Sequence, residues 1–124
     1  MKPEAVDSII DLDAAATRLS VKVSEWRGAG LDVTEPTWRD QGEGWPPKLK
    51  TLRAEVVRPD SLGVTARYGL KEGAVVLFEG GWCDVEFWSG DPTESPHLAA
   101  PGVDEALTLD AYIEVLDSFI RRFR

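Results

Sequence analysis

The chain contains very little cysteine or histidine: among 124 residues there is one of each, Cys83 and His97. A single cysteine cannot form an intramolecular disulfide, which agrees with a reducing compartment. We expect Cys83 to be a small buried residue, because no histidine lies near it in the sequence to activate its thiol. No spacing of His, Cys, Asp and Glu indicates a metal site, so we expect neither a metal nor another cofactor.

Long apolar runs are also missing. No stretch approaches the roughly 20 apolar residues that are needed to span a bilayer. The first residues, MKPEAVDSIIDLDAA, carry acids where a secretory signal has a basic end and an apolar centre. We therefore expect a cytoplasmic protein that does not contact membranes.

Basic residues are few and unevenly placed. The chain has 14 Lys and Arg against 22 Asp and Glu, a net charge of −8, and residues 72 to 120 hold 11 acids and no Lys or Arg. This balance argues against nucleic acid as a partner, because phosphate backbones recruit basic side chains. An acidic half can speed the encounter with a basic protein, although ordinary solubility also explains an acidic composition.

The length suits one domain, residues 1–124, with a single hydrophobic core. Apolar residues at helical spacing predict one helix over 4–27 and another over 107–123, the second with Thr108 as its N-cap. Extended segments are expected over 31–38, 49–58 and 64–70, with turns at 59–63 and 71–73 and a loop over 89–104 that crosses back over the sheet. The sequence therefore predicts an α+β fold, in which an antiparallel meander of four or five strands carries an N-terminal and a C-terminal helix on one face.

The stretch GAVVLFEGGWCDVEFWS, residues 73–89, predicts a hairpin with strands over 74–79 and 82–88. A two-residue turn at Gly80 and Gly81 would place Glu79 opposite Trp82. Alternation of side chains then gives an apolar face that holds Ala74, Val76, Phe78, Cys83, Val85 and Phe87. The other face mixes aliphatic, aromatic and acidic residues: Val75, Leu77, Glu79, Trp82, Asp84, Glu86 and Trp88.

We interpret this mixed face as a surface for a protein partner. A buried face does not normally hold three unpaired acids, and a solvated face has no need of two tryptophans. The expected contact residues are Trp82, Asp84, Glu86, Trp88, Glu79, Asp91 and Trp45. Trp45 lies in a Gly- and Pro-rich loop over 39–48, where it either closes the core edge or meets a partner. The alternative for the whole face is a second core layer, with a helix packed over the tryptophans.

Catalytic motifs are absent from the sequence: there is no Walker loop, GxGxxG, nucleophile elbow or HExxH. Asp84 and Glu86 lie two apart on a strand, so both point to one side, where paired carboxylates could serve acid–base chemistry or hold a divalent cation. Such pairs are common on solvated strands. We therefore expect a protein that is not an enzyme, and keep a carboxylate-based hydrolase as a lesser alternative.

Several short motifs occur in a familiar order. They are WRGAGLDVT at 26–34, the Pro47-Lys48 step, a P-x-x-L-G segment at 59–63, CDVEFW at 83–88 after a glycine, and a leucine-rich C-terminal helix. Together they resemble small immunity proteins of bacterial polymorphic toxin systems, in particular the TriTu immunity family. The resemblance extends from about Trp26 to the C-terminus, and the longer 39–47 loop and the additional tryptophans depart from it.

The resemblance implies a non-enzymatic inhibitor that binds a cognate toxin domain, and in that family the toxin resembles an ADP-ribosyltransferase acting on a translation factor. We expect the toxin to have a basic active-site surface, because many toxins grip phosphate-bearing cofactors or nucleic acid. The residues alone leave another class open: an acidic scaffold or a small-ligand-binding domain, with a pocket lined by Trp45, Trp82 and Trp88.

Overall fold

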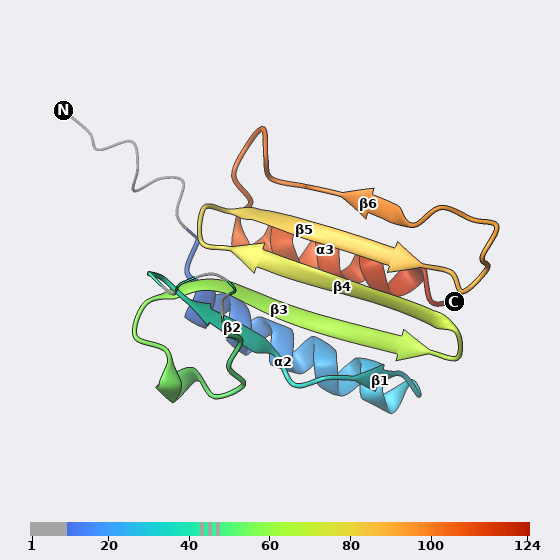
Figure 1. Cartoon of the computed structure of the whole chain (residues 1–124), viewed down its shortest axis with the longest axis horizontal. Helices are drawn as coiled ribbons and strands as arrows, with labels where there is room; N and C mark the ends of the chain where they lie inside the picture. The colour runs from blue at the N-terminus through green and yellow to red at the C-terminus, as the bar shows by residue number, and fades with distance from the viewer. Residues whose placement is uncertain (1–9, 43, 45, 47) are drawn as a thin grey trace.

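Six antiparallel strands form one sheet in the described part of the chain, and two helices pack against one face of that sheet (Figure 1). The computed structural model describes residues 10–42, 44, 46 and 48–124. The strands are β1 (Asp32–Val33), β2 (Thr37–Asp40), β3 (Pro59–Tyr68), β4 (Lys71–Phe78), β5 (Trp82–Trp88) and β6 (His97–Ala99). The helices are α2 (Leu12–Gly28) and α3 (Leu109–Arg121), with a short 3-10 helix, η1 (Arg53–Glu55).

The strand order is β1-β3-β4-β5-β6, and β2 pairs with β3 beside β1. Strands β3 to β6 follow one another along the chain and across the sheet, which is a meander. With one helix before the sheet and one after it, the α+β fold predicted from the sequence is confirmed. None of the helices in the described ranges is long and apolar enough to cross a membrane.

Helix α2 begins at Leu12 because the preceding residue caps it. The Oδ1 atom of Asp11 accepts hydrogen bonds from the backbone N–H groups of Asp13 and Ala14, at 3.0 and 3.1 Å. Its buried side chains are Leu12, Ala15, Leu19, Val23 and Trp26. The helix expected over 4–27 is thus present from residue 12, and residues 4–9 lie outside the described residues.

Helix α3 has the N-cap that the sequence predicts. The Oγ1 atom of Thr108 accepts a hydrogen bond from the backbone N–H of Ala111 at 3.1 Å. Phe119 lies between α2 and the sheet, with its ring centroid 6.0 Å from that of Trp26. A Cβ atom on Gly73 of β4 would lie 2.7 Å from the Phe119 ring, so glycine allows the helix to approach the strand closely.

The core lies between the helices and the inner face of the sheet. On the three central strands the inner side chains are Leu62, Val64, Ala66, Val75, Leu77, Cys83, Val85 and Phe87, which are all buried. They join the buried residues of α2 and α3 in one hydrophobic cluster. Cys83 is fully buried there, as its sequence context predicts.

The β4–β5 hairpin differs from the sequence prediction by one residue in register. Phe78, not Glu79, pairs with Trp82, so the loop has three residues instead of two. Gly81 has φ of 90°, whereas Gly80 is not in the positive-φ region. A left-handed third residue is typical of three-residue hairpin loops, and the Gly-Gly pair was wrongly taken for a two-residue turn.

The changed register reverses the two faces of β4 and leaves those of β5 as predicted. Because side chains alternate, a slip of one residue sends every side chain of a strand to the other side. Val75 and Leu77, expected on the mixed face, are core residues with exposed fractions of 1% and 0%. Ala74, Val76 and Phe78, expected in the core, point away from the helices instead.

Four other expected segments also differ from the structure. The strand over 31–38 is divided into β1 and β2 by a break at Pro36, and 49–58 is not a strand but holds only a bridge at Lys50 and the short helix η1. Residues 59–63 begin β3 instead of forming a turn, since Pro59 takes the first strand position, where proline is tolerated. The loop over 89–104 contains β6, which pairs along the edge of β5.

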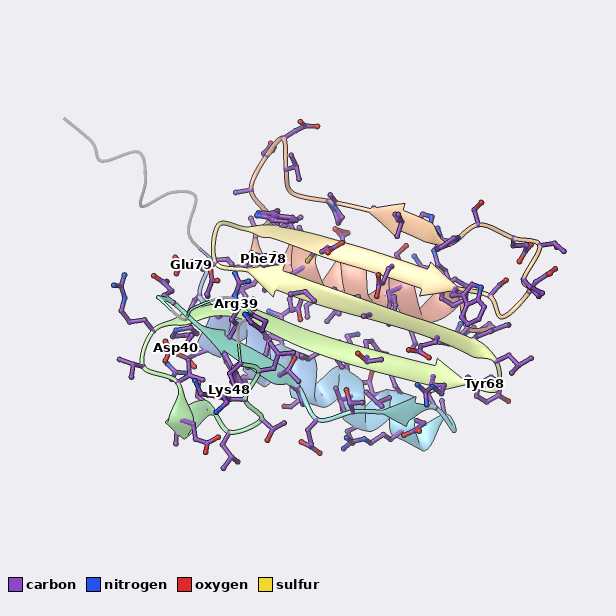
Figure 2. The ribbon with its side chains drawn as sticks, in the orientation of Figure 1. Arg39, Asp40, Lys48, Tyr68, Phe78 and Glu79 are labelled. Atoms are coloured by element: carbon purple, nitrogen blue, oxygen red, sulfur yellow. The ribbon has the colours of Figure 1, made fainter. Side chains whose placement is uncertain are left out.

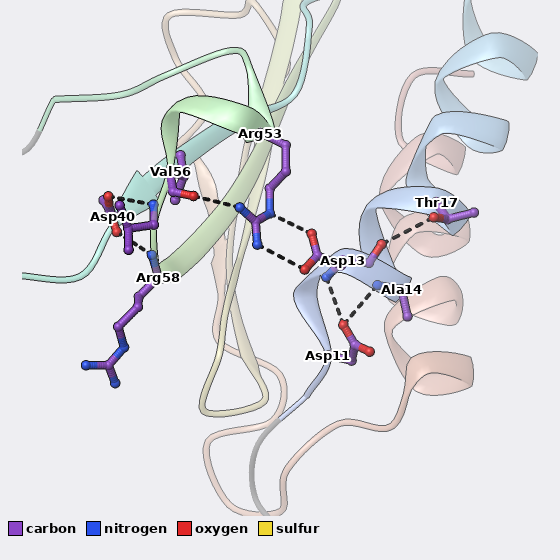
Figure 3. Close-up of polar contacts among 9 residues, drawn as sticks. Asp11, Asp13, Ala14, Thr17, Asp40, Arg53, Val56 and Arg58 are labelled. Atoms are coloured by element: carbon purple, nitrogen blue, oxygen red, sulfur yellow. Dashed lines mark hydrogen bonds and ion pairs between the residues drawn. The ribbon is translucent and has the colours of Figure 1, made fainter.

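The segment 49–58 is held in place by Arg53 and Asp40 (Figure 3). The Arg53 guanidinium contacts both carboxylate oxygens of Asp13 in α2, at 2.6 and 3.1 Å, and donates to the Val56 carbonyl at 2.7 Å. It also lies 5.4 Å from the ring centroid of Trp38. The Asp40 carboxylate accepts from two successive backbone N–H groups, those of residues 57 and 58. These contacts replace the strand pairing that the sequence predicts here.

Candidate functional site

One face of the sheet is covered by no helix in the described part of the chain, and we call its outward-pointing residues the open face. In Figure 1 both helices lie behind the sheet, so this face is turned toward the viewer. Strand register assigns to it Thr37, Arg39, Ser61, Gly63, Thr65, Arg67, Glu72, Ala74, Val76, Phe78, Trp82, Asp84, Glu86, Trp88 and Leu98. Because neither of the two described helices packs on this face, the alternative of a second core layer under a helix is wrong for Trp82 and Trp88.

An aromatic ledge occupies one end of the open face. The rings of Phe78 and Trp82 stack, with centroids 4.4 Å apart and planes inclined by 16°. The guanidinium carbon of Arg39 lies 5.7 Å from the Phe78 centroid, and its nitrogens form an ion pair with Asp60. Figure 2 shows Arg39 and Phe78 at this same end of the sheet. Trp82 is thus held in a defined orientation before any partner binds.

Two acids lie between the tryptophans of β5. Asp84 and Glu86 are exposed, and their cross-strand neighbours on β4 are the apolar residues Val76 and Ala74. Within the described residues, neither carboxylate has an ion pair or a side-chain hydrogen bond. Their negative charges are therefore available to a partner.

Two other acids of residues 72–120, the stretch without Lys or Arg, form ion pairs on the helix side of the sheet. Asp110 pairs with Arg18 at 3.2 Å, and Asp117 pairs with Lys22 at 2.8 Å, so both join α3 to α2. The excess of acids after residue 72 thus has two roles. Asp110 and Asp117 pair with basic residues of α2, whereas Asp84 and Glu86 of β5 lie on the open face.

Trp88 ends β5 with its side chain 46% exposed and borders a shallow recess of about 340 Å³. The recess forms because the small Ala74 lies between Thr65 and Glu86 on the neighbouring strands. Pro96 also lines it. This end of the open face is hollow, whereas the end at Trp82 carries stacked rings.

The remaining predicted contact residues lie around this face. Glu79 is in the β4–β5 loop, where its backbone N–H donates to Asp60 and its carbonyl accepts from Ile10, at 3.0 and 2.9 Å. Asp91 lies in the β5–β6 loop and accepts from the backbone and hydroxyl of Thr93 at 2.9 and 2.7 Å, which lowers the pKa of Asp91. The prediction for Trp45 falls outside the described residues.

The residues suited to chemistry do not converge. The described part of the chain holds no group of three or more His, Cys, Asp and Glu placed to bind a metal ion. Burial, with the nearby Asp84 charge, raises the pKa of the Cys83 thiol to about 12, so it stays protonated. His97 lies on β6, paired with Phe87 at the sheet edge. The open face instead carries exposed acids and aromatic rings.

Trp82 and Trp88 lie at opposite ends of β5. Trp82 and Trp88 are six residues apart on β5, or about 20 Å along an extended strand. Two larger hollows, of about 560 and 650 Å³, lie on the helix side and are lined by neither of them. The first is bordered by Trp26 and Phe123, and the second by Val115 and Phe119.

Sequence reasoning missed Phe78, Val76 and Arg39 as residues of the open face. For β4 the missing signal was the loop length, because Glu-Gly-Gly allows a two-residue or a three-residue connection. Arg39 was placed in a loop because Gly and Pro follow it closely, but β2 continues to Asp40.

Comparisons with models of known protein families, with characterised proteins and with solved structures found no match to this chain. The likeness to the TriTu immunity family stays a prediction from short motifs. Evidence on function therefore comes from the geometry and charge of the open face.

Proposed function

We propose that this protein is an immunity protein, a non-enzymatic inhibitor that binds a cognate bacterial toxin domain through the open face. One observation carries the proposal: a sheet face that no described helix covers, with a tryptophan at each end of β5 and, between them, two acids that pair with none of the described residues. Its motifs resemble those of an immunity family, which supports the same class of function. We place the interaction in the cytoplasm, with a protein and not a nucleic acid as the partner.

The tryptophans suit the role of anchors. Trp and Tyr dominate the binding energy of protein interfaces because they bury a large area at little entropic cost. Trp82 is already oriented by its stack on Phe78, so its binding requires little ordering. Trp88 is half-exposed and loses more accessible surface when a partner covers it.

The acids suit selectivity and speed. Asp84 and Glu86 have no internal partner among the described residues, so they are free to pair with Lys or Arg of the toxin. Complementary charge raises association rates and disfavours partners of the wrong sign. A toxin whose active site grips phosphate groups, as an ADP-ribosyltransferase does, supplies a basic surface of the required sign.

The size of the open face agrees with a protein interface. Strands lie about 4.8 Å apart and rise about 3.3 Å per residue, so the sheet spans roughly 20 Å by 30 Å. That projected area, about 600 Å², approaches the roughly 800 Å² that each partner contributes to a standard interface. The face and one adjoining loop would together provide a complete contact.

The test takes the product of the neighbouring gene as the candidate toxin, purifies it and measures its affinity for this protein by calorimetry. We expect Trp82→Ala to weaken binding by at least thirtyfold, and Asp84→Lys by at least tenfold, since they remove an anchor and reverse a charge. The matched controls lie on the helix side: Tyr68→Ala, an exposed aromatic, and Glu114→Lys, an exposed acid. If both open-face variants fold and bind like the wild type, the proposal is wrong.

A further inference from the structure

We propose that the recess beside Trp88 receives one arginine side chain of the partner protein, with its guanidinium on the indole and against Glu86. This inference rests on the proposed function, because it names the chemical group that the open face recognises. It concerns the hollow end of the face, at a distance from the aromatic ledge of Phe78 and Trp82.

The shape of the recess suits one side chain. Its volume of about 340 Å³ is at the lower end of the range for small-molecule sites, about 300–1,000 Å³, and it opens on a flat sheet. The small residue Ala74 is part of its lining on the sheet, and Trp88 and Pro96 also form part of its walls. A planar group with a thin apolar stem fits between such walls.

The charge of the recess suits a cation. Glu86 lines it without an ion pair among the described residues. Glu72 also lines it and is engaged at Oε1 only, by Nε and Nη2 of Arg67 at 3.2 and 2.9 Å. An arginine of this chain is thus already bound at the rim, and the recess offers a second carboxylate to a second guanidinium.

The combination of an indole and a carboxylate favours arginine over lysine. A guanidinium is flat and more weakly hydrated than an ammonium group, so it stacks on an aromatic ring while its edge donates to a carboxylate. Trp88 provides that ring, and Glu86 lies on the same face of β5, two residues away. An ammonium group would pair with the Glu86 carboxylate but would not stack on the Trp88 ring as a flat guanidinium does.

The test follows the indole N–H signals of the ¹⁵N-labelled protein while N-acetyl-arginine amide is added at constant ionic strength. N-acetyl-lysine amide is the charge-matched probe, and the Trp82 indole is the internal reference. We expect the Trp88 signal to respond at least threefold more steeply to the arginine probe. Glu86→Gln should reduce that response at least threefold, and the control Glu114→Gln, on the exposed side of α3, should leave it unchanged.

Equal responses to the two probes, or a response that Glu86→Gln does not reduce, would overturn the arginine contact. A second measurement separates this from the proposed function, since it uses the toxin itself. If Trp82→Ala abolishes toxin binding while Trp88→Ala and Glu86→Gln leave it unchanged, the immunity function stands and the arginine recess is wrong. If wild-type protein does not bind the toxin at all, the proposed function fails instead.

Discussion

Phe78 lies directly across the hairpin from Trp82, and their rings are nearly parallel with centroids 4.4 Å apart. Cross-strand aromatic pairs stabilise a sheet and fix which residues face each other. Here the pair places both rings on the open face and Leu77 opposite Cys83 in the core. One register choice therefore decides both the binding surface and the packing behind it.

The three-residue loop predicts different effects for its two glycines. Gly81→Ala should destabilise the protein by about 1–2 kcal/mol, because Gly81 has φ of 90°, a region that disfavours L-residues. Gly80→Ala is the matched control and should change stability by less than about 0.5 kcal/mol, since a Cβ there makes only an ordinary contact with Trp82. Urea unfolding of both variants gives the values. Equal losses would indicate the two-residue turn instead.

Removing the buried hydroxyl of Tyr112 should not destabilise the protein. Tyr112 is fully buried on α3, and its hydroxyl oxygen has no hydrogen-bond partner in the part of the chain that the structure describes. Because an unsatisfied buried polar group costs about 1–3 kcal/mol, Tyr112→Phe should be neutral or stabilising. Thr108→Ala, which removes the cap of the same helix, should cost about 1 kcal/mol. Thermal unfolding compares the two, and a large loss in Tyr112→Phe would reveal a missing partner.

We expect the Arg53 side chain to contribute more to stability than the side chain of Arg58. Arg53→Ala should cost about 1–2 kcal/mol, because it loses the contacts with Asp13, the Val56 carbonyl and the Trp38 ring together. Arg53→Lys should recover only part of this, since lysine lacks the planar fork. In the control Arg58→Ala the Asp40 contact remains, because it uses the backbone N–H of residue 58. Proteolysis of the 49–58 segment offers a second readout.

Acid should weaken the fold through carboxylates whose pKa is lowered in the folded state. Backbone N–H donation from Val57 and Arg58 lowers the pKa of Asp40 from 3.8, and hydrogen bonding to Arg53 does the same for Asp13. As pH falls, the unfolded chain protonates these two carboxylates before the folded protein does. Their contribution to stability is therefore present above about pH 4 and is lost as pH falls through their pKa values in the folded state. Unfolding free energy measured from about pH 6 to about pH 3 should fall, and fall less in Asp40→Asn. If the unfolding free energy of Asp40→Asn depends on pH as steeply as that of the wild type, Asp40 does not contribute to the acid sensitivity.

Cys83 should be unreactive in the native protein. Its thiol is fully buried, and burial is the main cause of its raised pKa of about 12, so little thiolate exists at neutral pH. Alkylation should become fast only when denaturant unfolds the chain. Rapid labelling of the native protein would show that β5 opens locally.

Local patterns in the sequence were sufficient for particular elements. The spacing of Tyr112, Leu116 and Phe119 and the cap at Thr108 predicted α3, because a helix is specified by neighbours three or four residues away. Alternation along 82–88 assigned both faces of β5 without its partner strand. That alternation alone predicted that one face of β5 carries Trp82, Asp84, Glu86 and Trp88.

Features set by pairing with distant segments could not be predicted in the same way. Residues 49–58 contain enough Val and Leu for a strand, but Arg53 binds Asp13, which is 40 residues away. β6 is only three residues long, and its pairing with β5 defines it more than its own composition does. The faces of β4 depended on one extra residue in a loop.

The amino-acid order by itself determined the helices, the acidic character and the aromatic–acidic alternation of β5, because these depend on spacing within one segment. The sequence pattern also predicted that both helices pack on one face of the sheet, whereas only the tertiary structure decided which side chains of β4 that face carries. That arrangement follows from the apolar inner faces of three strands and two helices, which exclude water only when they meet in one core. As a result, neither described helix covers the other side of β5, which carries Trp82, Asp84, Glu86 and Trp88.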